Sequence, residues 1–213
     1  MATSMNLKLL EQNKIHELRW IASEAMAVDR MRNNWPIIVT DLKAIQLSKD
    51  FDKEAKRTAQ GYYNKLVEIP FLFLLHFMCD LLDELSIVSR QMQERYGLLP
   101  DQWDIHQNLR DKLEHLKMHP GPKLQEFIDN CKCFNTVTGQ SVPITCTLES
   151  ITTANKVTFR SIEISMKGQQ INTRRGSSRV PTLDDFRDDI LENLITFFNA
   201  RFPSESLESF KAS

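Results

Sequence analysis

Two histidines and two cysteines have spacings that could suit a metal ion. His115 and His119 are four residues apart, so they would share one face of a helix, and Cys131 and Cys133 follow with one residue between them. Imidazole nitrogens and thiolates are ligands that zinc prefers. The order and the tight Cys-x-Cys spacing differ from those of the common zinc fingers. Exposed histidines at a helix end and small apolar cysteines on a short helix explain the pattern equally simply, so we assign no metal ligand.

Clusters of carboxylates could hold paired metal ions, as in nucleases. Such sites use carboxylates from separate elements to hold two cations about 3.5–4 Å apart. Here one cluster shares a helix face and the other gathers at a helix start, where the helix dipole favours anions. Solvated or ion-paired surface residues explain both clusters. The chain also has no Gly-x-Ser-x-Gly turn and no phosphate-binding glycine loop, so we predict no catalytic residue, no cofactor and no small-molecule substrate. The clustered residues are Asp80, Asp83, Glu84, Asp184, Asp185, Asp188 and Asp189.

Three arginines form the strongest candidate for nucleic-acid binding. Arg174, Arg175 and Arg179 lie in a short segment with one glycine and two serines, which reads as a flexible joint. Arginines on a flexible loop can neutralise phosphates and release counterions. The formal net charge of −1 argues against binding through overall charge, so we expect any nucleic-acid binding to be weak. Further basic residues could extend the patch, namely Lys156, Arg160 and Lys167.

Size and composition predict a globular, helical protein. The chain has 213 residues, 41% of them hydrophobic and 26% charged, which is enough for one substantial core or two small ones. It contains only six glycines, and its apolar residues recur at regular intervals, which favours helices with short joints. We therefore predict an all-α fold, in the form of an elongated multi-helix domain.

The cysteines and the longest apolar run bear on the compartment. Four cysteines without an apolar leader after Met1 are typical of free thiols in a reducing compartment. The run from residue 69 to 92 is interrupted by His76 and four charged residues, which argues against a membrane helix. We expect an intracellular protein, nuclear or cytoplasmic, that is neither secreted nor embedded in a membrane.

Apolar spacing predicts the first helices. One helix covers residues 19–32, and Pro36 begins another that runs to Ile45, since proline suits a first helical turn. Residues 50–66 have a single apolar stripe and are expected to form a surface helix. Residues 69–92 are apolar around most of the circumference, which predicts a central helix buried on two or more sides.

The later helices have clear boundaries. One follows Asp101 and stops at residues 119–122, and the last begins after Thr182 and ends before Pro203. The inward face of the first of these two is predicted to contain Ile105, Leu109, Leu113 and Leu116. That of the last helix is predicted to contain Leu183, Phe186, Ile190, Leu194 and Phe197, widened by Leu191, Ile195 and Phe198.

The segment between these helices is harder to interpret. Residues 123–133 are expected to form a short helix, and residues 135–148 a loop with at most a short strand. Residues 156–164 have the β-branched content of a strand, but helical spacing from Ile151 to Met166 competes with it. We favour a helix for residues 149–171.

Several segments, taken in order, resemble the hAT-superfamily transposases. They are Arg19-Trp20 with Ser23, Trp35-Pro36 to Leu42, Phe71 to Ser86, and Phe197 to Pro203. The chain is similar to vertebrate hAT-derived proteins of the ribonuclease-H-like and zinc-finger-associated type, and the resemblance covers nearly all of it. It implies that residues 1–33 are a helical remnant of an RNase H-like core, residues 34–203 form the helical insertion domain, and residues 204–213 are a tail.

The same resemblance bears on activity. In that family two aspartates and a glutamate of the core bind divalent metal; the aspartates should precede Arg19-Trp20, and the glutamate should follow the region of Pro203. The eighteen residues before Arg19 contain no aspartate, and the helical context of the glutamate is not found. The resemblance therefore transfers no catalytic carboxylate, and we expect no enzyme activity. It transfers only Trp20, whose family counterpart is implicated in handling unpaired bases; the alternative is a tryptophan in a core.

These inferences converge on a binding function. We predict a non-catalytic, hAT-transposase-derived fragment that acts as a protein-interaction or weak nucleic-acid-binding module, with another protein or a second copy as partner. One alternative is part of an active or domesticated transposase, whose metal-dependent DNA cleavage and strand transfer are completed by other segments. Another is an unrelated helical scaffold.

Overall fold

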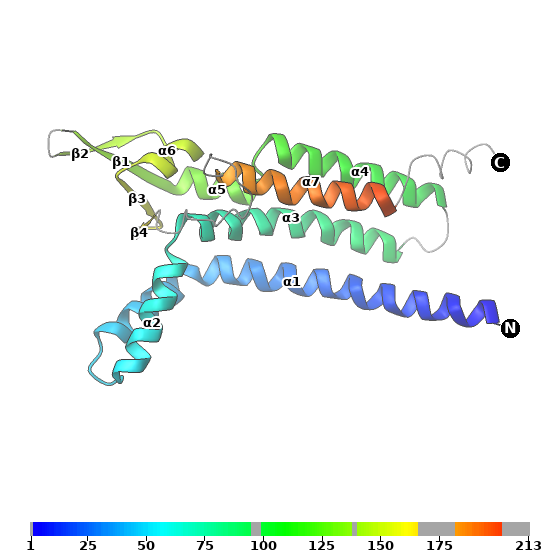
Figure 1. Cartoon of the computed structure of the whole chain (residues 1–213), viewed down its shortest axis with the longest axis horizontal. Coiled ribbons are helices and arrows are strands. Elements are labelled where there is room, and N and C mark those ends of the chain that lie inside the picture. The colour runs from blue at the N-terminus through cyan, green and yellow to red at the C-terminus, as the bar shows by residue number, and fades with distance from the viewer. Residues whose placement is uncertain (1, 95–98, 138–139, 166–181, 202–213) are drawn as a thin grey trace, which may run out of the picture. The chain divides into compact units, whose positions relative to one another are not determined.

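The computed structural model describes the backbone of residues 2–94, 99–137, 140–165 and 182–201, and the side chains of residues 21–91, 104–136, 140–165 and 182–200. Most of these residues are helical, as predicted (Figure 1). The described helices are α1 (Ala2–Leu47), α2 (Lys53–Leu66), α3 (Ile69–Glu94), α4 (Leu99–Met118), α5 (Pro122–Asn130), α6 (Leu148–Thr153) and α7 (Leu183–Arg201). The described strands are β1 (Cys131–Val137), β2 (Gln140–Ile144), β3 (Lys156–Phe159) and β4 (Ile162–Ile164).

The strands correct the all-α prediction. They form one antiparallel sheet in the order β2-β1-β3-β4, with Cys133 of β1 opposite Ile144 of β2 and Val157 of β3. The predicted helix over residues 123–133 ends at Asn130. Of the predicted helix over residues 149–171, the structure describes residues 149–165, and within that range the helix ends at Thr153. Since helical spacing and a short β-hairpin both fit this stretch, its β-branched content was the better guide.

The hairpin of β3 and β4 turns through two residues. Arg160 and Ser161 both have positive φ, at 47° and 66°. A two-residue turn with both φ angles positive matches the right-handed twist of the flanking strands, but it normally carries Asn-Gly or Asp-Gly. The usual sequence signal for a hairpin is therefore missing at this turn, although the turn itself is present.

The described elements divide into two compact units. Unit 1 comprises residues 1–29, 78–120 and 185–213, and unit 2 comprises residues 30–77 and 121–184. The division falls within α1, within α3 and near the start of α7, so each of these helices contributes residues to both units.

Unit 1 is helical in its described part. Figure 1 shows α4 and α7 running beside α3, and ion pairs join α4 to both neighbours, from Lys112 to Glu84 and from Lys117 to Glu192. The four predicted inward residues of α4 are all buried, which confirms that face. These buried residues of α4 are Ile105, Leu109, Leu113 and Leu116. The buried face of α7 is centred on Leu191 and Ile195. Two residues predicted to lie on that face, Phe186 and Phe197, are instead 37% and 59% exposed.

Helix α1 continues through Pro36, which corrects the predicted start of a second helix there. Proline has no N–H to donate to the carbonyl four residues earlier, so the Arg32 carbonyl loses its helical partner. The Arg160 guanidinium donates to this oxygen from Nη1, at 3.4 Å. A side chain from the β3–β4 turn thus supplies a partner for the carbonyl group that the proline leaves unpaired.

Aromatic rings fill the core of unit 2. Phe159 of β3 lies at the centre of the cluster, with ring centroids 5.4 Å from Trp35, 5.0 Å from Phe127 and 5.5 Å from His76. Trp35 also donates from its indole Nε1 to the Leu66 carbonyl at 2.8 Å. These contacts join α1, α3, α5 and the sheet in one core. They also place the end of α2 against α1.

Candidate functional site

The residues predicted to contact nucleic acid have no described side chains. Trp20 lies in α1, where only its backbone is described, and Arg174, Arg175 and Arg179 lie outside the described residues. Their roles therefore stay predictions.

The proposed extension of the basic patch is engaged within the protein. Lys156 Nζ lies 3.2 Å from Glu163 Oε2, and Arg160 Nη2 lies 3.5 Å from Glu126 Oε1. Lys167 lies outside the described residues. Because a carboxylate neighbours each described cation, these two side chains are poor candidates for neutralising phosphates.

The residues first considered as metal ligands do not form a site. His115, near the end of α4, and His119, just after it, lie in unit 1 with their rings tilted at 48° and their centroids 5.0 Å apart. Cys131 and Cys133 belong to unit 2, on strand β1 rather than on the short helix expected for them. Across the described ranges, no group of three or more His, Cys, Asp or Glu side chains could hold a metal ion.

Several of the clustered carboxylates have structural partners. Glu84 pairs with Lys112, and Asp188 Oδ1 lies 3.1 Å from Arg187 Nη2. Asp80 is buried in α3, whereas Asp83 on the same helix is exposed. These carboxylates thus occupy different environments, unlike the converging carboxylates of a two-metal site.

A chain of charges borders the aromatic core of unit 2. Buried Arg32 donates from Nη1 to Glu126 Oε2 at 3.0 Å, and Arg160 approaches the other carboxylate oxygen of the same glutamate. The Arg160 guanidinium carbon also lies 5.2 Å from the centre of the Phe159 ring, within the range of a cation–π contact. Removing Glu126 would leave the buried Arg32 without this carboxylate, so the cluster is best understood as structural.

His76 lies in the same core and is buried. Its Nδ1 is 2.7 Å from the Leu72 carbonyl oxygen, and its ring stacks on Phe127 at 5.0 Å. A carbonyl only accepts, so the neutral ring carries its proton on Nδ1. Burial lowers the pKa of His76 to about 4, and the positive charges of Arg32 and Arg160 act in the same direction. The imidazole is therefore neutral near pH 7.

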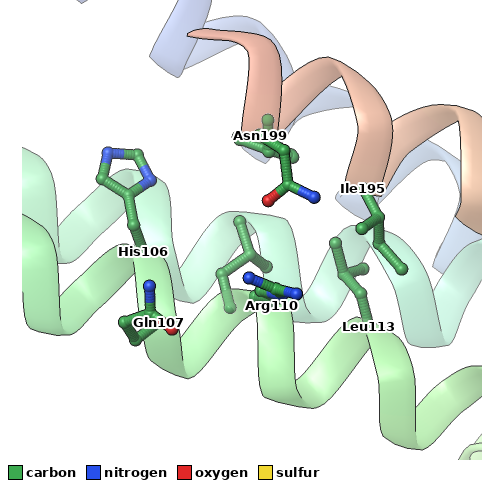
Figure 2. A pocket seen from close by; sticks show the side chains of 8 residues that line it. His106, Gln107, Arg110, Leu113, Ile195 and Asn199 are labelled. Carbon is green, nitrogen blue, oxygen red and sulfur yellow. The ribbon is translucent and has the colours of Figure 1, made fainter. Parts of the chain in front are cut away.

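A small hollow lies between α4 and α7. Figure 2 shows His106, Gln107 and Arg110 from α4 facing Ile195 and Asn199 from α7. Burial lowers the pKa of His106. The hollow has a volume of about 30 Å³, which is roughly the space of one water molecule. It is too small for a substrate.

A larger, apolar groove lies between the end of α1 and helix α2. Its volume is about 380 Å³. Two aromatic residues on it remain unusually exposed, Phe51 at 46% and Tyr62 at 60%. Exposed aromatic side chains beside an apolar groove are typical of a surface that binds a partner. The groove is lined by Leu42, Ile45, Phe51, Asp52, Glu54, Ala55, Thr58, Ala59 and Tyr62.

The sequence predicts the helix that forms one wall of this groove, but not the groove itself. Residues 50–66 were predicted to form a surface helix with one apolar stripe, and α2 confirms this, with Ala59 as its buried residue. The stripe normally indicates packing against a core. The predicted stripe contains Phe51, Ala55, Ala59, Tyr62 and Leu66, and its spacing alone does not show that Phe51 and Tyr62 stay exposed.

Comparison of the chain with protein families, with curated proteins and with solved structures finds no match. Among the helices of the described ranges, none has both the length and the apolar character that crossing a membrane requires.

Proposed function

We propose that the protein is a non-catalytic binding module of hAT-transposase origin, and that it holds a basic amphipathic helix of another protein in the groove between α1 and α2. The exposed aromatic pair on this groove is the observation that carries the proposal. The transposase origin rests on the order of the sequence motifs. A metal-dependent DNA cleavage activity of the isolated chain would contradict the non-catalytic part.

The shape and lining of the groove suit a helix. Both of its walls come from helices, α1 and α2, and its floor includes the small residues Ala55 and Ala59. An amphipathic helix inserts large apolar side chains at positions i, i+3, i+4 and i+7 into grooves of this kind. Phe51 and Tyr62 would then contact the anchoring side chains at the two ends.

The charge of the lining selects between classes of partner. Asp52 and Glu54 line the groove, and no basic residue does. Carboxylates repel the phosphates of a nucleic acid, whereas they attract lysine or arginine side chains that flank an apolar helix face. The groove therefore favours a protein partner over DNA or RNA.

A designed peptide pair tests this proposal. One peptide is a helix of about 14 residues with leucines on one face and lysines on the other; its matched partner has glutamate at every lysine. The full chain should bind the lysine peptide more tightly than the glutamate peptide in fluorescence anisotropy. Tyr62→Ser should weaken that binding about tenfold, since a few aromatic contacts carry most of the binding energy at such interfaces.

A matched variant controls for the loss of an exposed aromatic ring. Phe197 of α7 is as exposed as Tyr62, and Phe197→Ser should leave peptide binding unchanged. The proposal fails if the two variants behave alike, or if a single-stranded DNA oligonucleotide binds the groove in place of the peptide. It also fails if sedimentation shows a dimer that Tyr62→Ser dissociates, because the groove would then hold a second copy.

A further inference from the structure

Three thiols of unit 2 meet at one edge of the sheet. Cys131 and Cys133 occupy alternate positions of β1, so they share a face of the strand, and both are buried. Cys146 follows β2 and is only half-buried. Its Sγ lies 2.8 Å from Cys133 Sγ and 2.9 Å from the Cys131 carbonyl oxygen.

The pairing of the strands brings the sulfur atoms of Cys133 and Cys146 close together. Cys133 is paired with Ile144 across the β1–β2 ladder, so Cys146 lies two residues beyond its direct neighbour. The chain then enters α6, where Thr147 and Ser150 form a reciprocal cap. The Ser150 hydroxyl lies 3.9 Å from Cys133 Sγ and donates to the Thr145 carbonyl at 2.8 Å. The segment that carries Cys146 is thus held on both sides.

The two thiols differ in their access to solvent. Cys146 lines an open hollow of about 350 Å³ together with residues of β1 and β2. Cys133 lines the same hollow, but its side chain is buried, with only 1% of its surface exposed. Burial, followed by the contact with Cys146, raises the pKa of Cys133 to about 12. Because the thiolate is the reactive form, an external reagent should meet Cys146 first.

We propose that Cys133 and Cys146 form a redox-sensitive pair that closes to an intrachain disulfide when a small disulfide such as oxidised glutathione is present. The Cys146 thiolate attacks one sulfur of oxidised glutathione and displaces one glutathione thiolate. The Cys133 thiol then loses its proton to solvent and attacks the Cys146 sulfur, which displaces glutathione a second time. Two protein thiols are oxidised, one glutathione disulfide is reduced, and both protons end on glutathione thiols.

The geometry leaves little for the protein to rearrange. The sulfur atoms are within van der Waals contact, and a disulfide would shorten their separation to about 2.05 Å. The bond would tie β1 to the start of α6 and close the chain between residues 133 and 146. Such a cross-link restricts the unfolded chain, so the oxidised protein should have a melting temperature roughly 5 °C higher or more.

Mass spectrometry tests the pairing directly. The full chain is incubated with oxidised glutathione under native conditions, alkylated with iodoacetamide and digested with trypsin. Cleavage after Lys132 separates Cys131, in the peptide Leu124–Lys132, from the peptide Cys133–Lys156, which contains both proposed partners. The second peptide should lose two hydrogens and take no alkyl group, while Cys131 should be alkylated.

Two variants sharpen the result. Cys146→Ser should abolish the loss of two hydrogens, whereas Cys131→Ser should retain it. A glutathione adduct that persists on Cys146, a bond that uses Cys131, or full alkylation of the peptide Cys133–Lys156 would each overturn the proposal. These outcomes do not depend on peptide binding at the α1–α2 groove, so the two proposals can fail separately.

Discussion

At the scale of single residues, His76 is the clearest case in which position determines chemistry. The sequence shows only a polar residue that interrupts an apolar helix. In the fold, one ring nitrogen faces the Leu72 carbonyl and the ring is packed against Phe127 and Phe159. Two nearby guanidinium groups add to the cost of protonating it, while Glu126 partly opposes them. The histidine acts as a neutral core residue.

This burial predicts how stability depends on pH. The pKa of His76 is about 4 in the folded protein against an ordinary 6.5, so between these values the unfolded chain binds a proton that the folded chain does not. The contribution of the neutral His76 ring to the free energy of unfolding is complete above pH 6.5, and it is lost as the pH falls toward 4. At about 1.4 kcal/mol per pKa unit, the free energy of unfolding should fall by about 3 kcal/mol across this window.

Urea unfolding at several pH values measures this effect. His76→Gln should flatten the fall in the unfolding free energy between pH 6.5 and 4, although the variant should be less stable at pH 7. His115→Gln, which removes a solvent-exposed histidine from α4, serves as the control. An unchanged slope in His76→Gln would show that other groups cause the pH dependence.

At the scale of elements, side chains from one element repeatedly satisfy carbonyl groups that another element leaves unpaired. Trp35 of α1 donates to the Leu66 carbonyl at the end of α2, and Arg187 of α7 donates to the Lys117 carbonyl at the end of α4. Arg160 does the same for the carbonyl released by Pro36. The last four carbonyls of a helix have no partner within it, so such contacts stabilise helix ends and fix how neighbouring elements pack.

Arg187 offers a test of this role. It is buried, and it donates from Nη2 to the Lys117 carbonyl at 2.9 Å. Arg187→Met keeps much of the apolar stem but removes the donor, and it should lower the free energy of unfolding by about 1–3 kcal/mol. The solvent-exposed Arg90 of α3 provides the matched change Arg90→Met, which should cost much less. Equal losses in urea unfolding would argue against the cap.

The same contacts explain which elements could be predicted. The inward face of α4 follows from spacing alone, because its four buried positions are all aliphatic. For α7 spacing misleads, since the inward position that Arg187 occupies looks polar until the end of α4 is placed beside it. The hairpin of β3 and β4 was missed because its turn, Arg160-Ser161, lacks the usual turn residues.

At the scale of the whole molecule, the candidate sites depend on contacts that no local pattern reveals. The sequence marks the apolar stripe of α2, but only the fold shows that Tyr62 stays exposed beside α1. Likewise, Cys131 and Cys133 stand out in the sequence, whereas Cys146 joins them only because β1 pairs with β2. The net charge of −1, unlike these contacts, can be read from the composition without knowledge of the fold.

That near-neutral charge leads to a last prediction, on DNA binding. With so little overall attraction, affinity for duplex DNA should be weak at physiological salt, and any salt dependence should come from Arg174, Arg175 and Arg179. Three phosphate contacts give a slope of about −2.7 for the logarithm of the binding constant against that of salt concentration. Fluorescence anisotropy with a labelled duplex at several salt concentrations measures it. Changing all three arginines to alanine should bring the slope close to zero.

A second triple variant separates local from overall charge. Lys53, Arg57 and Lys65 are exposed on α2, and changing these three to alanine lowers the net charge by the same three units. If DNA is held by the predicted loop, this control keeps the slope of the unmodified chain, because counterion release depends on the contacts made with phosphates. If both variants lose the slope equally, overall charge governs the weak binding and the loop has no special role. A slope that survives in the arginine variant places the contacts elsewhere.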